Sequence, residues 1–220
     1  MMATGSAPVT PEPGRSVARR PPAIMAPGRV KPAAITILMG AAVLTLVQIV
    51  NWAMDYRLNA AGIRPRTLGG LWGIADGPLL HTGWGHLISN LVPFVIFGFL
   101  ILVGGLRQFL AVTVLVWLVS GLGVWLTAGS GSLTVGASAL VFGYLAFLVL
   151  RGLFSRRFAQ IVMGVVLLAL WGGIFWGLLP GHDGISWQAH LFGAIGGALA
   201  AFLVARADAP QRSRRALPSA

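Results

Sequence analysis

The sequence contains no cysteine and very little charge. Only 10% of its 220 residues are charged and 56% are apolar, whereas a soluble domain carries about 25% charged residues. The missing cysteine excludes disulfides, thiolate nucleophiles and cysteine-based metal sites. The shortage of charge argues against an ordinary soluble domain and indicates a membrane protein.

Acidic residues are scarcer than basic ones, 5 against 16, which gives a formal charge of +11. Nucleic-acid binding is not indicated, because the basic residues are spread over tails and short loops and form no stripe interleaved with stacking aromatic residues. Membrane topology explains the basic residues better, since short loops left in the cytoplasm carry an excess of Lys and Arg.

Six apolar segments approach the roughly 20 helical residues that cross a hydrocarbon core. They are residues 34–54, 86–104, 108–128, 136–150, 158–179 and 188–205. With the N-terminus inside, 13 of the 16 basic residues lie on the cytoplasmic side. The sequence therefore predicts an all-α polytopic bundle of six transmembrane helices in the plasma membrane, with both termini cytoplasmic.

The membrane domain is expected at residues 33–206. Residues 1–32 are rich in Pro, Ala and Arg and residues 207–220 are polar, so both are predicted to be disordered cytoplasmic tails. The external connection at residues 55–85 has apolar clusters punctuated by glycine. It is compatible with a loop in the membrane interface or with an ordinary ordered loop. No internal repeat supports an inverted-repeat transporter.

Polar residues inside the predicted spans are candidates for function, because they are costly in lipid. No Asp, Glu, Lys or Arg lies in the six segments, and the candidates are His86, Asn90, Ser138 and His190. Counting back from the cytoplasmic arginines at about 1.5 Å per residue places Ser138, Asn90 and His190 roughly 20–25 Å from that side. These side chains are expected to meet in the outer half of the membrane.

Ser138 and His190 are a candidate nucleophile and base. A serine hydroxyl attacks when a base takes its proton, and histidine is the usual base because its pKa lies near neutrality. The external carboxylates lie in loops, so the pair is expected to act as a dyad. His86 and Asn90, four residues apart on one helical face, can donate with the Ser138 backbone N–H to a developing oxyanion. The Gly- and Ser-rich stretch before Ser138 implies a water-filled cavity.

Three motifs occur in order along the chain. They are His81-x4-His86-x3-Asn90, Gly136-Ala-Ser138-Ala-Leu-Val-Phe-Gly143 and His190-Leu-Phe-Gly193-Ala-Ile-Gly-Gly197. Together they resemble the motifs of the rhomboid family of intramembrane serine proteases, and the resemblance covers roughly residues 34–206. Three motifs in the correct order are far more specific than any one of them.

The resemblance implies that Ser138 is the nucleophile, His190 the base, and His86 and Asn90 the oxyanion donors together with the Ser138 amide. It also implies a serine endopeptidase that cuts transmembrane segments of membrane proteins near their outer ends. The implied partners are transmembrane protein substrates and membrane lipid, with no cofactor, metal or nucleic acid.

Other motif positions are expected to support the site. Phe142 stands where the family has an aromatic residue that packs against the catalytic histidine, and His81, Gly136 and Gly193 complete the motifs. One position departs from the pattern, because the glycine that usually follows the serine is Ala139 here. Relative to glycine, the alanine adds one methyl group where two helices are expected to be in crowded contact.

Two other functions remain open from the sequence. An inactive rhomboid-like protein would hold membrane clients without cutting them. A membrane haem protein would use a histidine pair, such as His86 and His190, as axial ligands.

Overall fold

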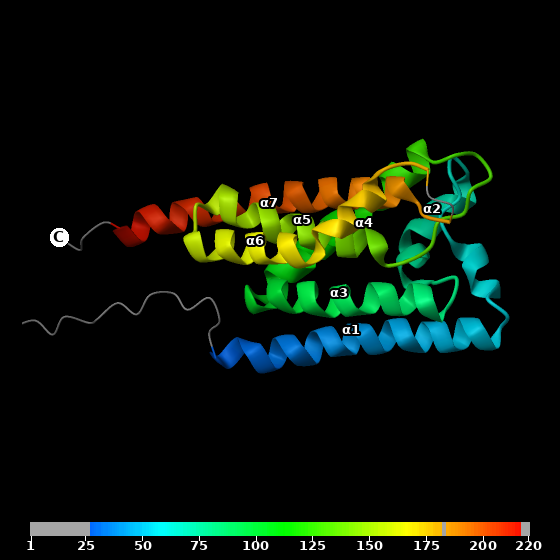
Figure 1. Ribbon diagram of the computed structural model, residues 1–220, viewed down its shortest axis with the longest axis horizontal. Helices are drawn as coiled ribbons and strands as arrows, with labels where there is room; N and C mark the ends of the chain where they lie inside the picture. The colour runs from blue at the N-terminus through cyan, green and yellow to red at the C-terminus, as the bar shows by residue number, and fades with distance from the viewer. Residues whose placement is uncertain (1–26, 182–183, 217–220) are drawn as a thin grey trace, which may run out of the picture.

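The computed structural model describes residues 27–181 and 184–216, which form a helical bundle (Figure 1). Six of the described helical segments are long and apolar enough to cross a membrane. They are α1 (Pro27–Ala53), α3 (Trp84–Val103), α4 (Leu106–Thr127), α5 (Ser138–Ser155), α6 (Phe158–Trp171) with its 3-10 extension η3 (Gly172–Leu178), and α7 (Trp187–Ala216). The prediction of an all-α bundle with six spans is confirmed.

Three boundaries differ from those expected. α1 begins at Pro27, inside a predicted disordered tail. Proline fits the first turn of a helix, because the N–H that it lacks would have no acceptor within the helix there. α5 runs to Ser155, five residues beyond the predicted segment. α7 continues to Ala216, so residues 207–216 are helical. The rest of the two predicted tails, residues 1–26 and 217–220, lies outside the described residues.

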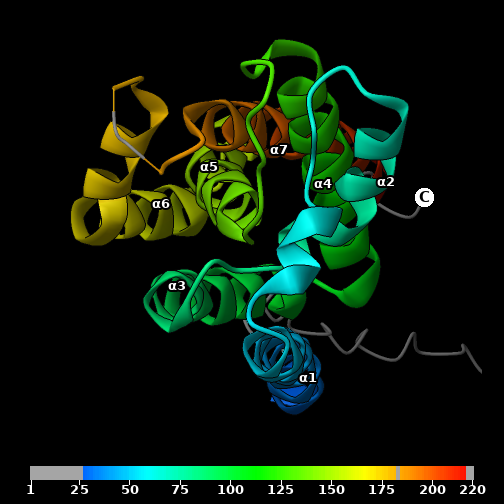
Figure 2. The same ribbon diagram turned by 90° about the vertical axis from the view of Figure 1, so that its right-hand side faces the viewer.

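The core of the bundle is α5, which Figure 2 shows surrounded by α3, α4, α6 and α7. Of its spanning segment 72% is buried, against 11–50% for the other five spans. α5 packs most extensively against α7. Glycines permit this approach, since a side chain at Gly197 would overlap the carbonyl of Gly143. Because α5 and α7 both start at the same end of the bundle, their first residues are neighbours (Figure 1).

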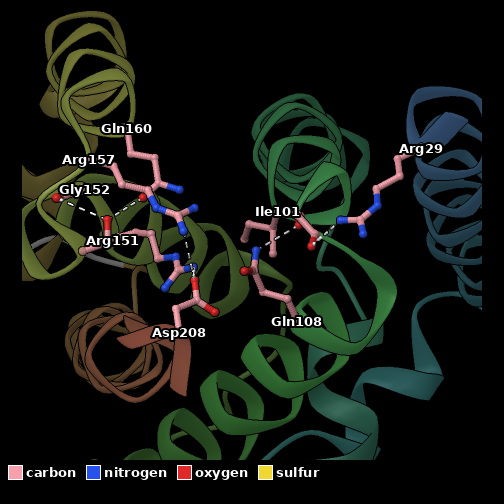
Figure 3. A network of polar contacts seen from close by, with 10 residues as sticks. Arg29, Ile101, Gln108, Arg151, Gly152, Arg157, Gln160 and Asp208 are labelled. Atoms are coloured by element: carbon pink, nitrogen blue, oxygen red, sulfur yellow. Dashed lines mark hydrogen bonds and ion pairs between the residues drawn. The ribbon is translucent and has the colours of Figure 1, made fainter. Parts of the chain in front are cut away.

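The opposite end of the bundle, where α1 begins and α7 ends, is called the terminal end below (Figure 1). Figure 3 shows its polar network, in which Asp208 of α7 pairs with Arg151 of α5 at 2.7 Å and lies 3.9 Å from Arg157. Arg151 is only 5% exposed, so it belongs to the helix packing and not to a solvated loop. The ion pair fastens α7 to α5 at residue 208, within the predicted tail.

The connection at residues 55–85 is ordered and contains η1 (Arg57–Ala61), α2 (Leu68–Asp76) and η2 (Gly77–Leu79). It carries exposed apolar side chains, since Leu68 is 84% and Trp72 is 78% exposed, as suits a segment in the membrane interface. On its inner side, Ile63 forms an antiparallel bridge with Thr134. This bridge holds the loop that leads into α5.

Candidate active site

Ser138 is the first residue of α5, and a tight loop delivers it there. Gly136 has φ of 120° and donates its N–H to the carbonyl of Gly77 at 2.9 Å. Only glycine suits this backbone, because a Cβ at residue 136 would also lie 2.7 Å from the His86 ring. At the start of a helix the Ser138 N–H has no intrahelical acceptor, so it is free to bind a negative oxygen.

His190 lies in the first turn of α7 and is held from two sides. Phe142 stacks on its ring with the centroids 4.0 Å apart and the planes 11° apart. The Nδ1 atom lies 3.0 Å from the carbonyl oxygen of Gly177. A carbonyl only accepts, so this contact assigns the proton to Nδ1 and leaves a lone pair on Nε2. The Gly177 carbonyl thus orients the ring, as a carboxylate does in a triad.

A cavity of about 420 Å³ brings the four predicted catalytic and oxyanion residues together, since Ser138, His190, His86 and Asn90 all line it. Phe142 is part of the same wall. The rest of the lining consists of Thr82, Ser89, Val135, Val141, Ile174, Gly184, Ile185 and Ser186. The cavity therefore joins a polar side on α3 to an apolar side on α5 and η3.

The polar side chains of α3 face the backbone that precedes Ser138. A Cβ at Gly136 would lie 2.7 Å from His86 Nε2 and 3.8 Å from Asn90 Nδ2. His86 Nδ1 is 3.1 Å from the hydroxyl of Thr82, and Asn90 Nδ2 donates to the His86 carbonyl at 3.0 Å. An amide nitrogen carries two hydrogens, so Asn90 keeps one donor for a ligand.

His81 lies behind the cavity and does not line it. The residue is fully buried, and its Nε2 accepts the Ala137 N–H at 3.3 Å. Its ring meets the His86 ring edge-on at 5.0 Å. Burial lowers the pKa of His81 to about 4, the His86 ring adds to the shift, and the Leu79 backbone opposes it. His81 is therefore neutral near pH 7 and braces the loop before Ser138.

Ala139 and Gly193 meet at the α5–α7 contact. A side chain at Gly193 would overlap the Ala139 carbonyl, so glycine is needed on α7. The methyl group of Ala139 is itself buried in an apolar cluster with Ile63, Ile74 and Val124. The departure from the usual glycine is thus accommodated by packing.

Two contacts of the site were not predicted from the sequence. The Gly177 carbonyl is a backbone group, so no residue type in the sequence indicates its role. Thr82 lies two residues before α3 begins, so its contact with His86 comes from the turn that enters the helix and helical spacing could not have predicted it. Among the described residues, no group of three or more His, Cys, Asp or Glu side chains is placed to hold a metal ion.

Comparison with known proteins places the whole site inside a conserved type of domain. The family model described as Rhomboid domain matches residues 68–207. The chain is 44% identical over 193 residues to Uncharacterized protein Rv1337 of Mycobacterium tuberculosis, covering 84% of this chain and 79% of that relative. It is 42% identical over 194 residues to Uncharacterized protein ML1171 of Mycobacterium leprae, covering 84% and 76% respectively.

Proposed function

The chain belongs to the rhomboid family, and we propose that it is an intramembrane serine endopeptidase that cleaves transmembrane segments of membrane proteins with a Ser138–His190 dyad. The observation that carries the proposal is the surroundings of His190. Its Nδ1 atom lies 3.0 Å from the Gly177 carbonyl oxygen, which assigns the ring proton to Nδ1, and its ring shares the cavity with Ser138. A neutral imidazole with a free Nε2 is the form that a general base needs.

In this mechanism His190 Nε2 takes the proton of Ser138 Oγ while the oxygen attacks the scissile carbonyl carbon. The negative charge that develops on the carbonyl oxygen is met by the Ser138 N–H, by Nε2–H of His86 and by the second N–H of Asn90. In this scheme the Thr82 hydroxyl, 3.1 Å from His86 Nδ1, is assigned as the donor of that hydrogen bond, so the single ring proton of neutral His86 is on Nε2.

The protonated His190 then gives its proton to the leaving amine, and an acyl ester remains on Ser138. Water from the cavity attacks this ester with His190 again as the base, which releases the acid product and restores the serine. The Gly177 carbonyl stabilises the Nδ1–H throughout. It carries no full charge, so it steadies the imidazolium less than a carboxylate does.

The proposed orientation has both termini in the cytoplasm, because 13 of the 16 basic residues then lie on that side. The cavity lies at the end of the bundle away from the terminal end. It would therefore face the outer half of the plasma membrane, where water is near. Transmembrane proteins of the same membrane are the proposed substrates, cut near their outer ends, and lipid surrounds the bundle.

A second candidate is a rhomboid-like protein that binds membrane clients without cutting them. Ala139 is the observation in its favour, because this residue replaces the glycine usual after the serine, although the fold accommodates its methyl group in an apolar cluster. Both candidates share the fold and the cavity. They differ in whether Ser138 reacts.

Serine-directed labelling separates these candidates. The purified chain in detergent is treated with a fluorophosphonate probe and, in liposomes, with a model transmembrane substrate. We expect label and cleavage in the wild type and neither in Ser138→Ala or His190→Ala. Ser89→Ala is the matched control, because Ser89 lines the same cavity but donates to its own helix at the His86 carbonyl. An unlabelled wild type that leaves the substrate intact would refute the peptidase proposal.

A further inference from the structure

The connection between α1 and α3 contains an arginine in a strained backbone conformation. Arg66 has φ of 55°, in the left-handed region that residues with a Cβ rarely adopt. Such a conformation persists only where its surroundings hold it, and strained residues cluster at functional sites. Arg66 directly precedes Thr67, which caps α2 by accepting the Gly70 N–H at 3.0 Å. The contacts of Arg66 therefore bear on what the strain serves.

Arg66 contacts the end of α4 with both its main chain and its side chain. Its backbone N–H donates to the Trp125 carbonyl at 3.0 Å, and its guanidinium donates to the Leu126 carbonyl at 3.0 Å. Carbonyls in the last turn of a helix have no donor within the helix, and a cation is favourable beside them. Arg66 therefore supplies two of the donors that the end of α4 lacks.

The second arm of the guanidinium reaches the loop that leads to Ser138. It donates to the Ser130 hydroxyl at 2.8 Å, and Ser130 lies in residues 128–137, which connect α4 to α5. Hydrogen bonds from a charged donor are stronger than those between neutral groups. Because the guanidinium is planar and its donors are fixed, one rigid group joins the end of α4 to the start of this loop.

Two further contacts of the same connection follow along the chain. Trp125 Nε1 donates to the Thr67 carbonyl at 2.9 Å. Ile63 and Thr134 exchange backbone hydrogen bonds of 2.9 and 3.1 Å, four residues before Ser138. The later part of the loop is thus held by backbone pairing, whereas its start is held by the Arg66 side chain.

We propose that Arg66 is a positioning residue for the nucleophile Ser138, because its guanidinium fixes the start of the loop at residues 128–137 against α4. Arg66 does not line the cavity, so it acts through the loop and not on the substrate. A displacement of about 1 Å in a reacting group can cost about 100-fold in rate. The pairing at Thr134 remains when Arg66 is removed, so we expect a smaller effect of about tenfold. This effect rests on the proposed function, whereas the contact with Ser130 does not.

Arg66→Ala is tested by the rate of fluorophosphonate labelling at Ser138 and by cleavage of a model transmembrane substrate. We expect about tenfold slower labelling and a similarly lower kcat, with KM unchanged because Arg66 does not line the cavity. Arg64→Ala is the matched control. Arg64 is an exposed arginine of the same connection, and its side chain has no hydrogen bond or ion pair within residues 27–181 and 184–216. Its rate should equal the wild type's.

A double-mutant cycle with Ser130→Ala shows whether the two side chains act together. Adding Arg66→Ala to Ser130→Ala should slow labelling by a smaller factor than adding it to the wild type, because the shared contact is already lost. Equal factors in the two backgrounds would contradict positioning through this loop.

Melting curves identify a temperature at which the variants are folded. Exposed charged contacts add little to global stability, so the rate is expected to change more than the melting temperature. Folded Arg66→Ala that labels as fast as Arg64→Ala would overturn the proposal. If Arg66→Ala does not fold, Arg66→Lys keeps the charge and loses the planar fork. Slower labelling of that variant would support the positioning role, and a wild-type rate would refute it.

Hydrogen–deuterium exchange tests the anchoring of the loop apart from catalysis. Amides of residues 128–137 should exchange faster in Arg66→Ala than in Arg64→Ala, because local opening depends on the contacts that hold a segment. Equal exchange would overturn the anchoring even in an active enzyme. A wild type without label would remove the proposed function, and the exchange rates would then decide the anchoring alone.

Discussion

Replacing Gly136 by alanine is the sharpest test of the oxyanion donors. The glycine has φ of 120°, where other residues are strained. The new Cβ would lie 2.7 Å from both Nε2 and Cε1 of His86, closer than side-chain carbons approach other atoms. Something must shift, and the His86 ring is the neighbour that the methyl group meets first.

The substitution has two effects, backbone strain at residue 136 and a clash with the His86 ring, and their expected magnitudes separate them. A residue held in a rarely populated backbone region costs on the order of 1–3 kcal/mol of stability. Loss of one oxyanion donor lowers kcat by about 10²–10³. Gly131→Ala provides the control, because Gly131 lies in the same loop with φ of 88° and has nothing within 4 Å of its added Cβ. Both variants should lose stability, and only Gly136→Ala should also lose about a hundredfold in rate.

The assay compares the two alanine variants in cleavage of a model transmembrane substrate and in labelling of Ser138. Tryptophan fluorescence during heating sets a temperature at which both are folded. If folded Gly136→Ala cleaves as fast as Gly131→Ala, then His86 does not stabilise the transition state from this position. The assignment of His86 as a donor would then be abandoned.

Three further outcomes follow from buried contacts. Asp208→Asn leaves the buried Arg151 without its carboxylate and should lower the free energy of unfolding by roughly 2–4 kcal/mol; an unchanged melting temperature would contradict the pairing. Burial lowers the pKa of His81 from 6.5 to about 4 in the folded chain. Between pH 4 and pH 6.5 the unfolded chain therefore binds one proton more at this residue than the folded chain does. Stability should fall as pH drops from 6.5 to 4, by at most about 3.4 kcal/mol, and the His81→Gln melting curves should lack this component. Gly197→Ala would press on the Gly143 carbonyl and should slow the labelling of Ser138 and lower the melting temperature together. A loss of stability alone would mean that the packing of α7 on α5 does not determine the position of His190 relative to Ser138.

The spans and the meeting of the polar residues were predictable because each depends on local sequence. The length of an apolar segment identifies a span. Counting residues back from the cytoplasmic arginines placed Ser138 and His190 at similar depths in the membrane. The end of α7 was not predictable in this way. Beyond residue 206, Asp208 of this helix pairs with Arg151, 57 residues earlier in the chain, and composition cannot reveal such a partner.

Two features of the structure, the Gly177 carbonyl and the buried Gln48 side chain, escaped prediction for different reasons. The sequence indicated a dyad because no carboxylate was placed to orient His190, yet a backbone carbonyl at Gly177 occupies that position at 3.0 Å. Gln48 was passed over because a single glutamine in an apolar span has no motif. Its complete burial, which only the fold shows, is what makes it noteworthy.

The proposed nucleophile and the proposed base, Ser138 and His190, are held by parts of the fold that differ greatly in burial. Ser138 begins the most buried helix, and its loop is fixed by Gly77, by His81 and by the bridge between Ile63 and Thr134. The base is oriented by the last part of η3, in a span of which only 11% is buried. Any displacement of this peripheral segment takes the Gly177 carbonyl away from Nδ1 while leaving Ser138 in place. The orientation of His190, more than the position of the serine, therefore depends on how α6 and η3 sit in the membrane.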